Sequence, residues 1–340
     1  MMKPMILTFT AAALLLLCGC SDNGFDESGG KGEMPSGGGN PQPVGMEVLG
    51  ASAGELQPLT RATYNTINSG SIGVFLNPKN TGEYDVKKNV KYTASQASGA
   101  TVWSSPDPLF FTAYMAYVCA YHPYVSASSY EDCTRFALST QAYNAAYDLS
   151  YAKQIPMNAT LGTATGTESG AGNKVNFTME RAYALVELNF MRGNIKDNAT
   201  ISRIEIITTS GLYSACNLNI SANTYSSFST APDNKFILDK EISLPKNTST
   251  TPVTQQILMV PTLSTATVQG LKLKLTLKST GSPTVSTSVS GITKFEKGKK
   301  YILNMTVNAT SVDLSTIQVQ TGWNDEAMAN SDGSTTLRPQ

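Results

Sequence analysis

Thiol and imidazole groups are the side chains with which a protein most readily builds a nucleophile or a zinc site, and this sequence has few of them. Its 340 residues include five cysteines and a single histidine, His122. The three cysteines beyond residue 20, Cys119, Cys133 and Cys216, contain no Cys-x-x-Cys pair, so neither a zinc site nor a cysteine–histidine dyad is predicted. His122 stands in "VCAYHPYV" beside aromatic residues and a proline, which is typical of a strand end, and we interpret it as structural. We therefore expect no metal ion and no cofactor.

The spacing of Cys119 and Cys133 leaves two interpretations open. An oxidising compartment permits a disulfide between them, but the spacing alone does not establish one. Buried, unpaired thiols, which pack as small apolar side chains, are the alternative.

Carboxylates and glycine-rich loops are the other groups that could support catalysis. Asp and Glu are scattered along the chain, so a two-carboxylate surface hydrolase stays an alternative, but no short signature selects a pair. The glycines of "SGGGN" and "SGAGN" lack the strand before, the helix after and the lysine of a phosphate-binding loop. The formal net charge is zero and 15% of residues are charged, so no basic field is available for nucleic acid. We expect neither enzymatic activity nor a nucleic-acid partner.

A further cysteine, Cys20, stands at the edge of an apolar run. Lys3 and the apolar residues 5–17 have the layout of an export signal, and the run is shorter than the roughly 20 residues that a membrane-spanning helix needs. The residues "LCGC" resemble the bacterial lipobox, in which the cysteine becomes an acylated N-terminus. Residues 1–20 are thus expected to be a lipoprotein signal peptide that ends at Cys20, which anchors the chain in the outer membrane. An ordinary secretory signal is the alternative.

The next residues, 21–43, are expected to form a flexible tether. They are rich in Gly, Pro and Ser, and they hold too few bulky apolar side chains to offset about 1–2 kcal/mol of backbone entropy per residue. Asp22, Asp26 and Glu27 follow Cys20 closely and resemble the acidic tether of surface-exposed lipoproteins in some Gram-negative anaerobes. This pattern favours a location on the outer surface of the cell.

Alternating apolar and polar residues dominate the rest of the chain and predict half-buried strands. In "GLKLKLTLKS" the leucines fall on one face and the lysines on the other, and "YILNMTVNAT", "RIEII" and "LVELNF" repeat the pattern. The stretch "LFFTAYMAYVCAYHPY" is apolar on both faces and is expected to lie centrally in a sheet. Turn residues separate these short strands, which together indicate an all-β protein built from sandwiches.

Two domains are predicted from the length and from one shift in composition. Residues 158–174, "NATLGTATGTESGAGNK", replace the apolar pattern with glycine, threonine and small residues. We therefore expect an N-terminal β-sandwich over residues 44–165 and a C-terminal β-sandwich over residues 166–340.

Taken in order, these segments resemble the fimbrillin family, the type V pilin subunits and their relatives from Gram-negative anaerobes. The resemblance covers nearly the whole chain and rests on the order and spacing of several segments. These are the lipobox with its acidic tether, "TRATYNTINSGSIGVF", "PLFFT" with "YVCAYHPY", "YDLSYAK", "NFTMERAYALVELNF", "QQILMVPT" and "FEKGKKYILNMTV" leading to "IQVQTGW".

The resemblance implies two tandem transthyretin-like β-sandwich domains and a fimbrial structural subunit or tip adhesin. In that family an arginine-specific protease cuts beside the first strand, here between Arg61 and Ala62, and releases the lipidated segment. The lost strand leaves a groove that the C-terminal strand of another pilin subunit fills by donor-strand exchange. The protein is then located first on the outer membrane and, after processing, in the fimbrium, where a surface receptor on a host or bacterium is a further expected partner.

The residues on either side of the proposed cut are compatible with this cycle. Ahead of Arg61, the side chains of Val44, Met46 and Val48 alternate as in a strand, although a solvent-exposed surface arginine is the alternative reading of Arg61. At the other end the donor-strand candidates change parity at Ser315 and Thr316, and an edge strand of the same domain is the alternative there. These candidates are Val312, Leu314, Ile317 and Val319. The polar extension beyond Trp323 leaves the choice between stalk and tip subunit open.

The main rival function is that of a permanently anchored surface lipoprotein that binds glycans. Trp103, Tyr143 and Tyr147 could stack on sugar rings if they were exposed, although such side chains are more often part of a core or an interface.

Overall fold

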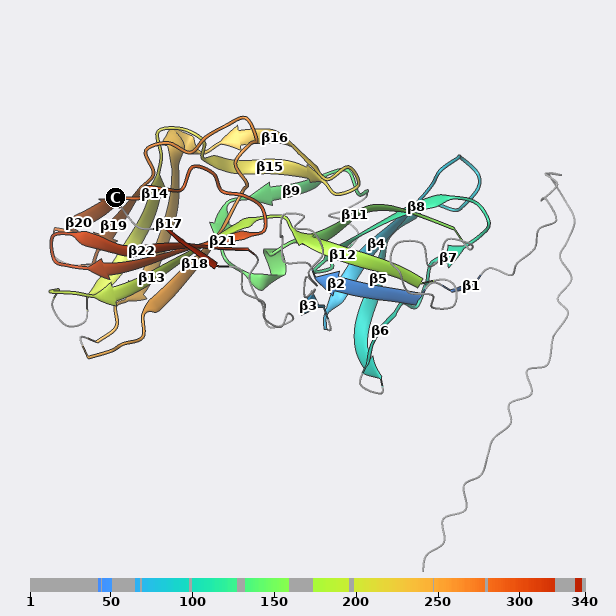
Figure 1. Ribbon diagram of the computed structural model, residues 1–340, viewed down its shortest axis with the longest axis horizontal. Coiled ribbons are helices and arrows are strands. Elements are labelled where there is room, and N and C mark those ends of the chain that lie inside the picture. The colour runs from blue at the N-terminus through green and yellow to red at the C-terminus, as the bar shows by residue number, and fades with distance from the viewer. Residues whose placement is uncertain are drawn as a thin grey trace, which may run out of the picture. The chain divides into compact units, whose positions relative to one another are not determined.

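The chain folds into strands arranged in five sheets, as the alternating pattern predicts (Figure 1). The computed structural model describes residues 42–43, 45–50, 65–67, 69–97, 100–126, 132–158, 174–195, 199–246, 248–278, 281–321 and 334–337. Within these ranges the helical elements are two 3-10 turns, η1 (Ala145–Tyr147) and η2 (Pro232–Asn234). The predicted all-β class is confirmed. No helix in these ranges has the length and apolar character needed to cross a membrane.

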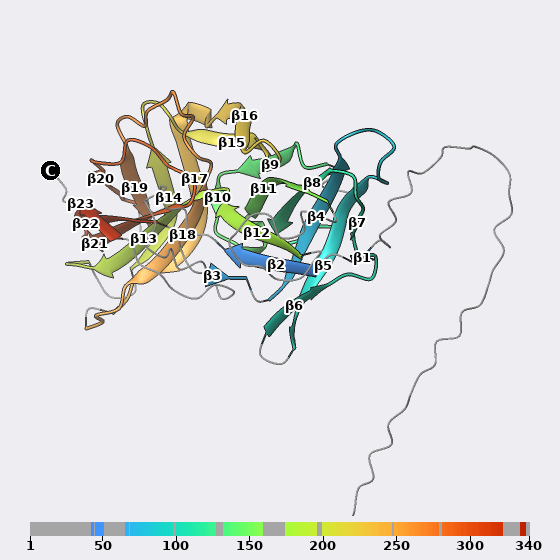
Figure 2. The same cartoon turned by 45° about the vertical axis from the view of Figure 1, so that its right-hand side comes forward.

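An eight-stranded sheet, called the N-terminal sandwich below, contains most of the strands that precede residue 182. Its strands, in spatial order, are β3 (Asn65–Thr66), β2 (Gly45–Gly50), β12 (Lys174–Arg181), β11 (Ser150–Met157), β8 (Ala116–His122), β4 (Ser71–Pro78), β5 (Lys87–Ala97) and β6 (Ala100–Ser104). Although β2 and β6 are far apart in this order, they lie beside each other, so the sheet curls around its core (Figure 2). A separate short pair joins β1 (Gln42–Pro43) to β7 (Phe110–Phe111).

The core inside this curled sheet is built from alternate residues of its strands. Val74 on β4, Tyr92 on β5 and Phe177 on β12 are buried together there. The central position predicted for "LFFTAYMAYVCAYHPY" is confirmed for "AYVCAYH", since β8 hydrogen-bonds to β11 on one side and to β4 on the other. It is wrong for "LFF", because β7 lies in the separate pair with β1 and Phe110 is exposed. His122 is the last residue of β8, at the strand end where the sequence predicts it.

Two further sheets face each other in the C-terminal sandwich. The first contains β10 (Gln141–Ala142), β18 (Val253–Met259), β13 (Ala184–Arg192), β21 (Lys299–Val307), β22 (Val312–Thr321) and β23 (Ser334–Leu337). The second contains β17 (Lys235–Ser243), β14 (Thr200–Ile207), β19 (Lys272–Leu277) and β20 (Thr284–Ser288). The apolar parities predicted from sequence form their shared core. Leu271, Leu273, Leu275 and Leu277 meet Val186, Leu188, Phe190, Tyr301, Leu303, Met305 and Val307 there.

A three-stranded sheet completes the fold, with β16 (Thr224–Thr230), β15 (Tyr213–Asn219) and β9 (Phe136–Ser139) in that order. Its apolar face joins residues of the eight-stranded and six-stranded sheets in a third core. Tyr121 of β8, Phe136 of β9 and Leu258 of β18 are all fully buried in this cluster.

Strands pair across the predicted domain boundary near residue 166, and the division into two domains stays a prediction. Residues 39–340 form one compact unit. β12 follows the predicted seam in sequence yet belongs to the eight-stranded sheet, and β10 precedes it yet pairs with β18. Most of the seam, residues 159–173, lies outside the described ranges.

Candidate assembly edges

The strand that precedes Arg61 in the chain lies against β12. β2 runs parallel to β12 in a continuous register from Gly45 opposite Lys174 to Gly50 opposite Met179. On its other side β2 pairs with β3 through two residues. Arg61 and Ala62 lie outside the described residues, in the stretch between the end of β2 and the start of β3. A break there would separate β2, but not β3, from the rest of the chain.

β12 carries the apolar side chains that a strand in the place of β2 would help to cover. Val175, Phe177 and Met179 are fully buried in the N-terminal core, while Asn176 and Thr178 between them are exposed. Along residues 174–179, β2 is the strand that pairs with β12, because β11 reaches only Glu180 and Arg181. Loss of β2 would leave the main chain of β12 unpaired along this length, which is the condition for strand addition.

The donor-strand candidates lie in β22, inside the sheet of their own sandwich. Val312 pairs with Val307, Leu314 with Met305, Ile317 with Leu303 and Val319 with Tyr301 of β21. Val312 and Ile317 are buried, and Leu314 and Val319 are half-buried against the same core. The register shifts where Asn304 and Met305 face Thr316 and Leu314, which leaves Ser315 as a bulge at the predicted change of parity. β23 pairs with the outer side of β22 through Ile317–Gln320.

A buried ion pair fixes the end of β12 away from β2. The guanidinium of Arg181 donates a hydrogen bond to the carboxylate of Asp148, which stands just before β11, and both side chains are buried. The Arg181–Asp148 ion pair is not predicted from the sequence. The "MER" run marks a charged strand end, but nothing in the sequence states that it lies next to Asp148.

A second polar cluster lies around Lys297, which precedes β21. Its Nζ donates to Glu180 Oε2 of β12 at 2.6 Å, to Tyr151 OH of β11 at 2.9 Å and to Asn223 Oδ1 at 2.8 Å. Burial by itself lowers the pKa of Lys297, but Tyr151 and Glu180 reverse this and raise it, so the amine stays charged. The cluster ties strands of the N-terminal sandwich to two turns of the C-terminal half.

The three cysteines beyond residue 20 are buried, free thiols in the third core. A hydrogen bond with Cys133 raises the pKa of Cys119, and the same bond, together with one from Asn77 Nδ2 at 3.3 Å, lowers the pKa of Cys133. Burial raises the pKa of Cys216 to about 12. No group of three or more His, Cys, Asp or Glu side chains is placed to hold a metal ion in the described part of the chain.

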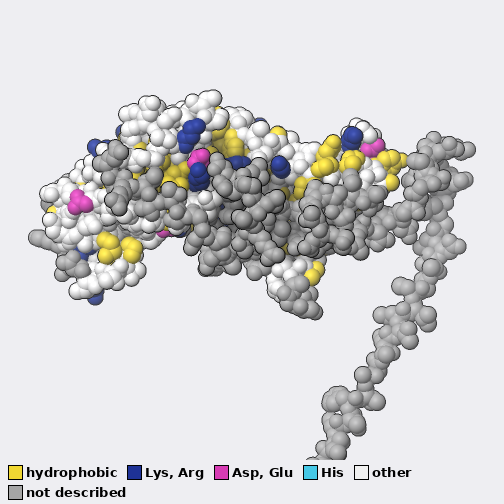
Figure 3. Space-filling model, in the orientation of Figure 1, with side chains coloured by type: hydrophobic (Ala, Val, Ile, Leu, Met, Phe, Trp, Pro, Cys, Tyr) yellow, Lys and Arg dark blue, Asp and Glu magenta, His cyan; other side chains and the backbone are white. Residues whose placement is uncertain are grey.

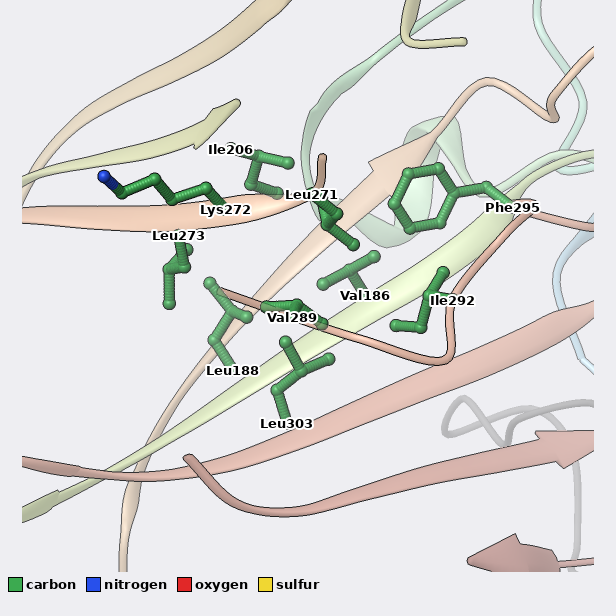
Figure 4. A pocket seen from close by; sticks show the side chains of 10 residues that line it. All are labelled: Val186, Leu188, Ile206, Leu271, Lys272, Leu273, Val289, Ile292, Phe295 and Leu303. Carbon is green, nitrogen blue, oxygen red and sulfur yellow. The ribbon is translucent and has the colours of Figure 1, made fainter. Parts of the chain in front are cut away.

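Two hollows among the described residues are large or enclosed enough to consider as sites. One is a cavity of about 10 Å³ between the sheets of the C-terminal sandwich, lined by aliphatic side chains and by Phe295 (Figure 4). Lys272 directs its amino group away from the others, and the space admits no more than about one water molecule, so this is a packing gap. The other is a cleft of about 310 Å³ at the end of β8.

The aromatic side chains considered for sugar stacking have different environments. Trp103 is buried in the N-terminal core, and Tyr143 is half-buried against the third core. Tyr147 is 57% exposed and lines the 310 Å³ cleft. Among the coloured residues on the face drawn in Figure 3, Lys and Arg side chains are scattered rather than gathered into one basic patch.

Comparison with known proteins gives the family. Two solved structures are similar over most of the chain. A Bacteroides uniformis protein assigned to cell adhesion is 18% identical, covers 85% of this chain and 99% of its own, and superposes with a TM-score of 0.52. A Bacteroides ovatus protein with the same assignment is 12% identical, covers 84% and 99%, and has a TM-score of 0.54. At these identities the likeness shows the fold.

No curated protein matches the sequence. The sequence profile of the fimbrillin-like family matches residues 60–322, which is most of the chain. The chain therefore belongs to the fimbrillin-like family.

Proposed function

We propose that this protein is a non-catalytic fimbrial subunit, a structural pilin or a tip adhesin, that assembles by exchange of strands. It is exported as a lipoprotein acylated on Cys20 and tethered to the outer surface of the outer membrane. An arginine-specific protease then cuts between Arg61 and Ala62, and the subunit enters the fimbrium. Membership of the fimbrillin-like family supports the fimbrial role.

One observation carries the strand-exchange part of the proposal. β2 precedes Arg61 and pairs with the edge of β12, whose alternate side chains belong to the N-terminal core. A cut at Arg61 lets β2 leave with the lipid anchor, and the exposed groove costs about 1.5–3 kcal/mol for each large apolar side chain that it uncovers. A strand from a second subunit removes that cost, so the groove drives assembly.

The donor is the C-terminal portion that includes β22, with Val312, Leu314, Ile317 and Val319 as the side chains that fill the groove. In the uncut subunit β22 is held by β21 over its whole length. Release therefore has to be offset by equivalent pairing in the next subunit. This requirement restricts exchange to subunits whose β12 edge is already open.

Treatment of the exported chain with an arginine-specific protease tests the proposal. We expect loss of the N-terminal piece that ends at Arg61, followed by a ladder of polymers on a native gel. Arg61→Lys keeps the charge but not the cleavage site, so it should stay monomeric. Arg135→Lys, at an exposed arginine elsewhere, is the matched control and should polymerise as the parent does. Cleavage after Arg61 without any ladder would refute strand exchange.

A further inference from the structure

The 310 Å³ cleft has a position and size that suit a small ligand. It is formed where the end of β8 meets β9 and η1, and Pro123, Ser139 and Tyr147 contribute from these three parts. Its volume lies at the lower end of the roughly 300–1,000 Å³ that small-molecule sites span. The cleft is therefore large enough for one sugar ring and its substituents.

The lining combines apolar walls with uncharged polar groups. Val125, Leu138 and Leu149 supply aliphatic surface, while Ser139 and Gln141 supply a hydroxyl and an amide. None of the described residues that line the cleft is charged. Against these residues an anionic or cationic ligand would be desolvated without a counter-charge, which disfavours both. A neutral ligand with one apolar side and several hydroxyls fits the lining.

Hydrogen bonds hold the backbone of Tyr147, whose side chain lines the cleft. Its backbone N–H donates to Asn144 O at 2.9 Å, and its carbonyl accepts from Leu149 N at 2.9 Å. The Asn144 side chain caps the turn by accepting from Ala146 N at 2.9 Å. Tyr147 as a whole residue is 57% exposed, although these hydrogen bonds hold its backbone. An exposed aromatic ring on a fixed turn loses little conformational freedom when a ligand stacks on it.

We propose that this cleft binds a neutral hexopyranose unit of a glycan, with the Tyr147 ring against the apolar face of the sugar and Ser139 and Gln141 at its hydroxyls. The C–H face of a pyranose matches an aromatic ring, and its hydroxyls both donate and accept, as an amide and a hydroxyl require. None of the described lining residues belongs to β2 or β12, so sugar binding and strand exchange can be tested separately.

Saturation-transfer NMR on the full exported chain tests the proposal. The probes are methyl β-D-galactopyranoside, methyl β-D-glucopyranoside, methyl α-D-mannopyranoside and N-acetyl-D-glucosamine. We expect at least one probe to bind, with saturation concentrated on the protons of one ring face. If none of the four binds, the proposal is wrong. It is equally wrong if an extended peptide binds the cleft and none of the sugars does.

Three variants locate the binding. Tyr147→Ala should lower the affinity for the sugar probe by about ten-fold. Tyr147→Phe, which keeps the ring, should change this affinity by less than about three-fold. Tyr114→Ala removes another exposed ring, away from the lining, and serves as the control with unchanged affinity. Equal affinity of the parent and Tyr147→Ala would overturn the assignment. Polymer laddering after cleavage should be the same in all three, so failure of this site leaves the assembly proposal untouched.

Discussion

Val48 of β2 pairs with Phe177 of β12, and the two strands run parallel. A segment that occupies the place of β2 therefore meets a strand whose buried side chains are already arranged in alternation, with Val175 and Met179 on either side of Phe177. Because the ladder is made by main-chain groups, the edge accepts any strand that offers compatible alternation and an unblocked backbone.

A peptide of residues 42–61 should therefore stop assembly when it is added in trans. It reproduces β1 and β2, so it caps the open β12 edge of the cut subunit, and mean polymer length should fall as its concentration rises. A control peptide with Glu47→Pro and Val48→Pro lacks the backbone N–H group at two adjacent residues, whose N–H groups point to opposite sides of the strand. This peptide should have no effect. Native gels of cut subunits grown with each peptide give the comparison, and equal inhibition by both peptides would contradict recognition through the strand edge.

Two truncations distinguish the contributions of β22 and β23 to the stability of the fold. Deletion of residues 322–340 removes β23 but keeps the β21–β22 ladder, so we expect the free energy of unfolding to change by less than about 1 kcal/mol. Deletion from Val312 also removes Val312 and Ile317 from the core, and should cost about 1.5–3 kcal/mol for each of them. Urea unfolding followed by far-ultraviolet circular dichroism measures both variants. Equal stability of the two would mean that β22 adds nothing to its own sandwich.

The sequence predicted local structure well because side-chain alternation is a local property. The faces of β19 and β21 and the bulge at Ser315 follow from the order of apolar and polar residues alone. Partners between strands do not, because they depend on contacts far apart in sequence. β12 as the neighbour of β2 is such a case, and so is Arg181 beside Asp148. Tyr147 lies on an exposed turn, although aromatic side chains are more often part of a core or an interface.

Removal of one partner of the Arg181–Asp148 pair should destabilise the fold strongly. Arg181→Met leaves a buried carboxylate without its counter-charge, and the loss is expected to be about 3–5 kcal/mol. The double variant Arg181→Met, Asp148→Leu removes both charges and should recover most of that loss. Denaturant unfolding of Arg181→Met, of Asp148→Leu and of the double variant completes the cycle. Additive losses would show that the two charges do not interact.

Gly73 is expected to be intolerant of any side chain. A Cβ at this position would collide with the ring of Tyr121 and with the Asn89 side chain, and Tyr121 OH already donates to Asn89 Oδ1 at 2.7 Å. Gly73→Ala should therefore lower the free energy of unfolding by about 1–3 kcal/mol. Gly82→Asn is the control, since nothing lies within 4 Å there and its cost is limited to the backbone strain of a φ of +87°, which asparagine bears better than most residues. Thermal melts that place both variants at the parental midpoint would contradict this crowding.

Stability should fall in alkaline solution because burial raises the pKa of Cys216 from 9.0 to about 12. A thiol that ionises less readily in the folded state contributes to the free energy of unfolding. This contribution is complete below pH 9 and is lost between pH 9 and 12. Cys216→Ala removes this contribution, so the difference in unfolding free energy between parent and variant should shrink over that window. The pKa of Cys133 shifts in the opposite direction, to about 7, because the hydrogen bond with Cys119 lowers it. The contribution of Cys133 to the free energy of unfolding is therefore complete above pH 9 and is lost as the pH falls through 7. Cys133→Ser should therefore lose most relative to the parent at pH 9 and less at pH 6. Parallel pH profiles for parent and Cys216→Ala would mean that the buried thiol does not ionise on unfolding.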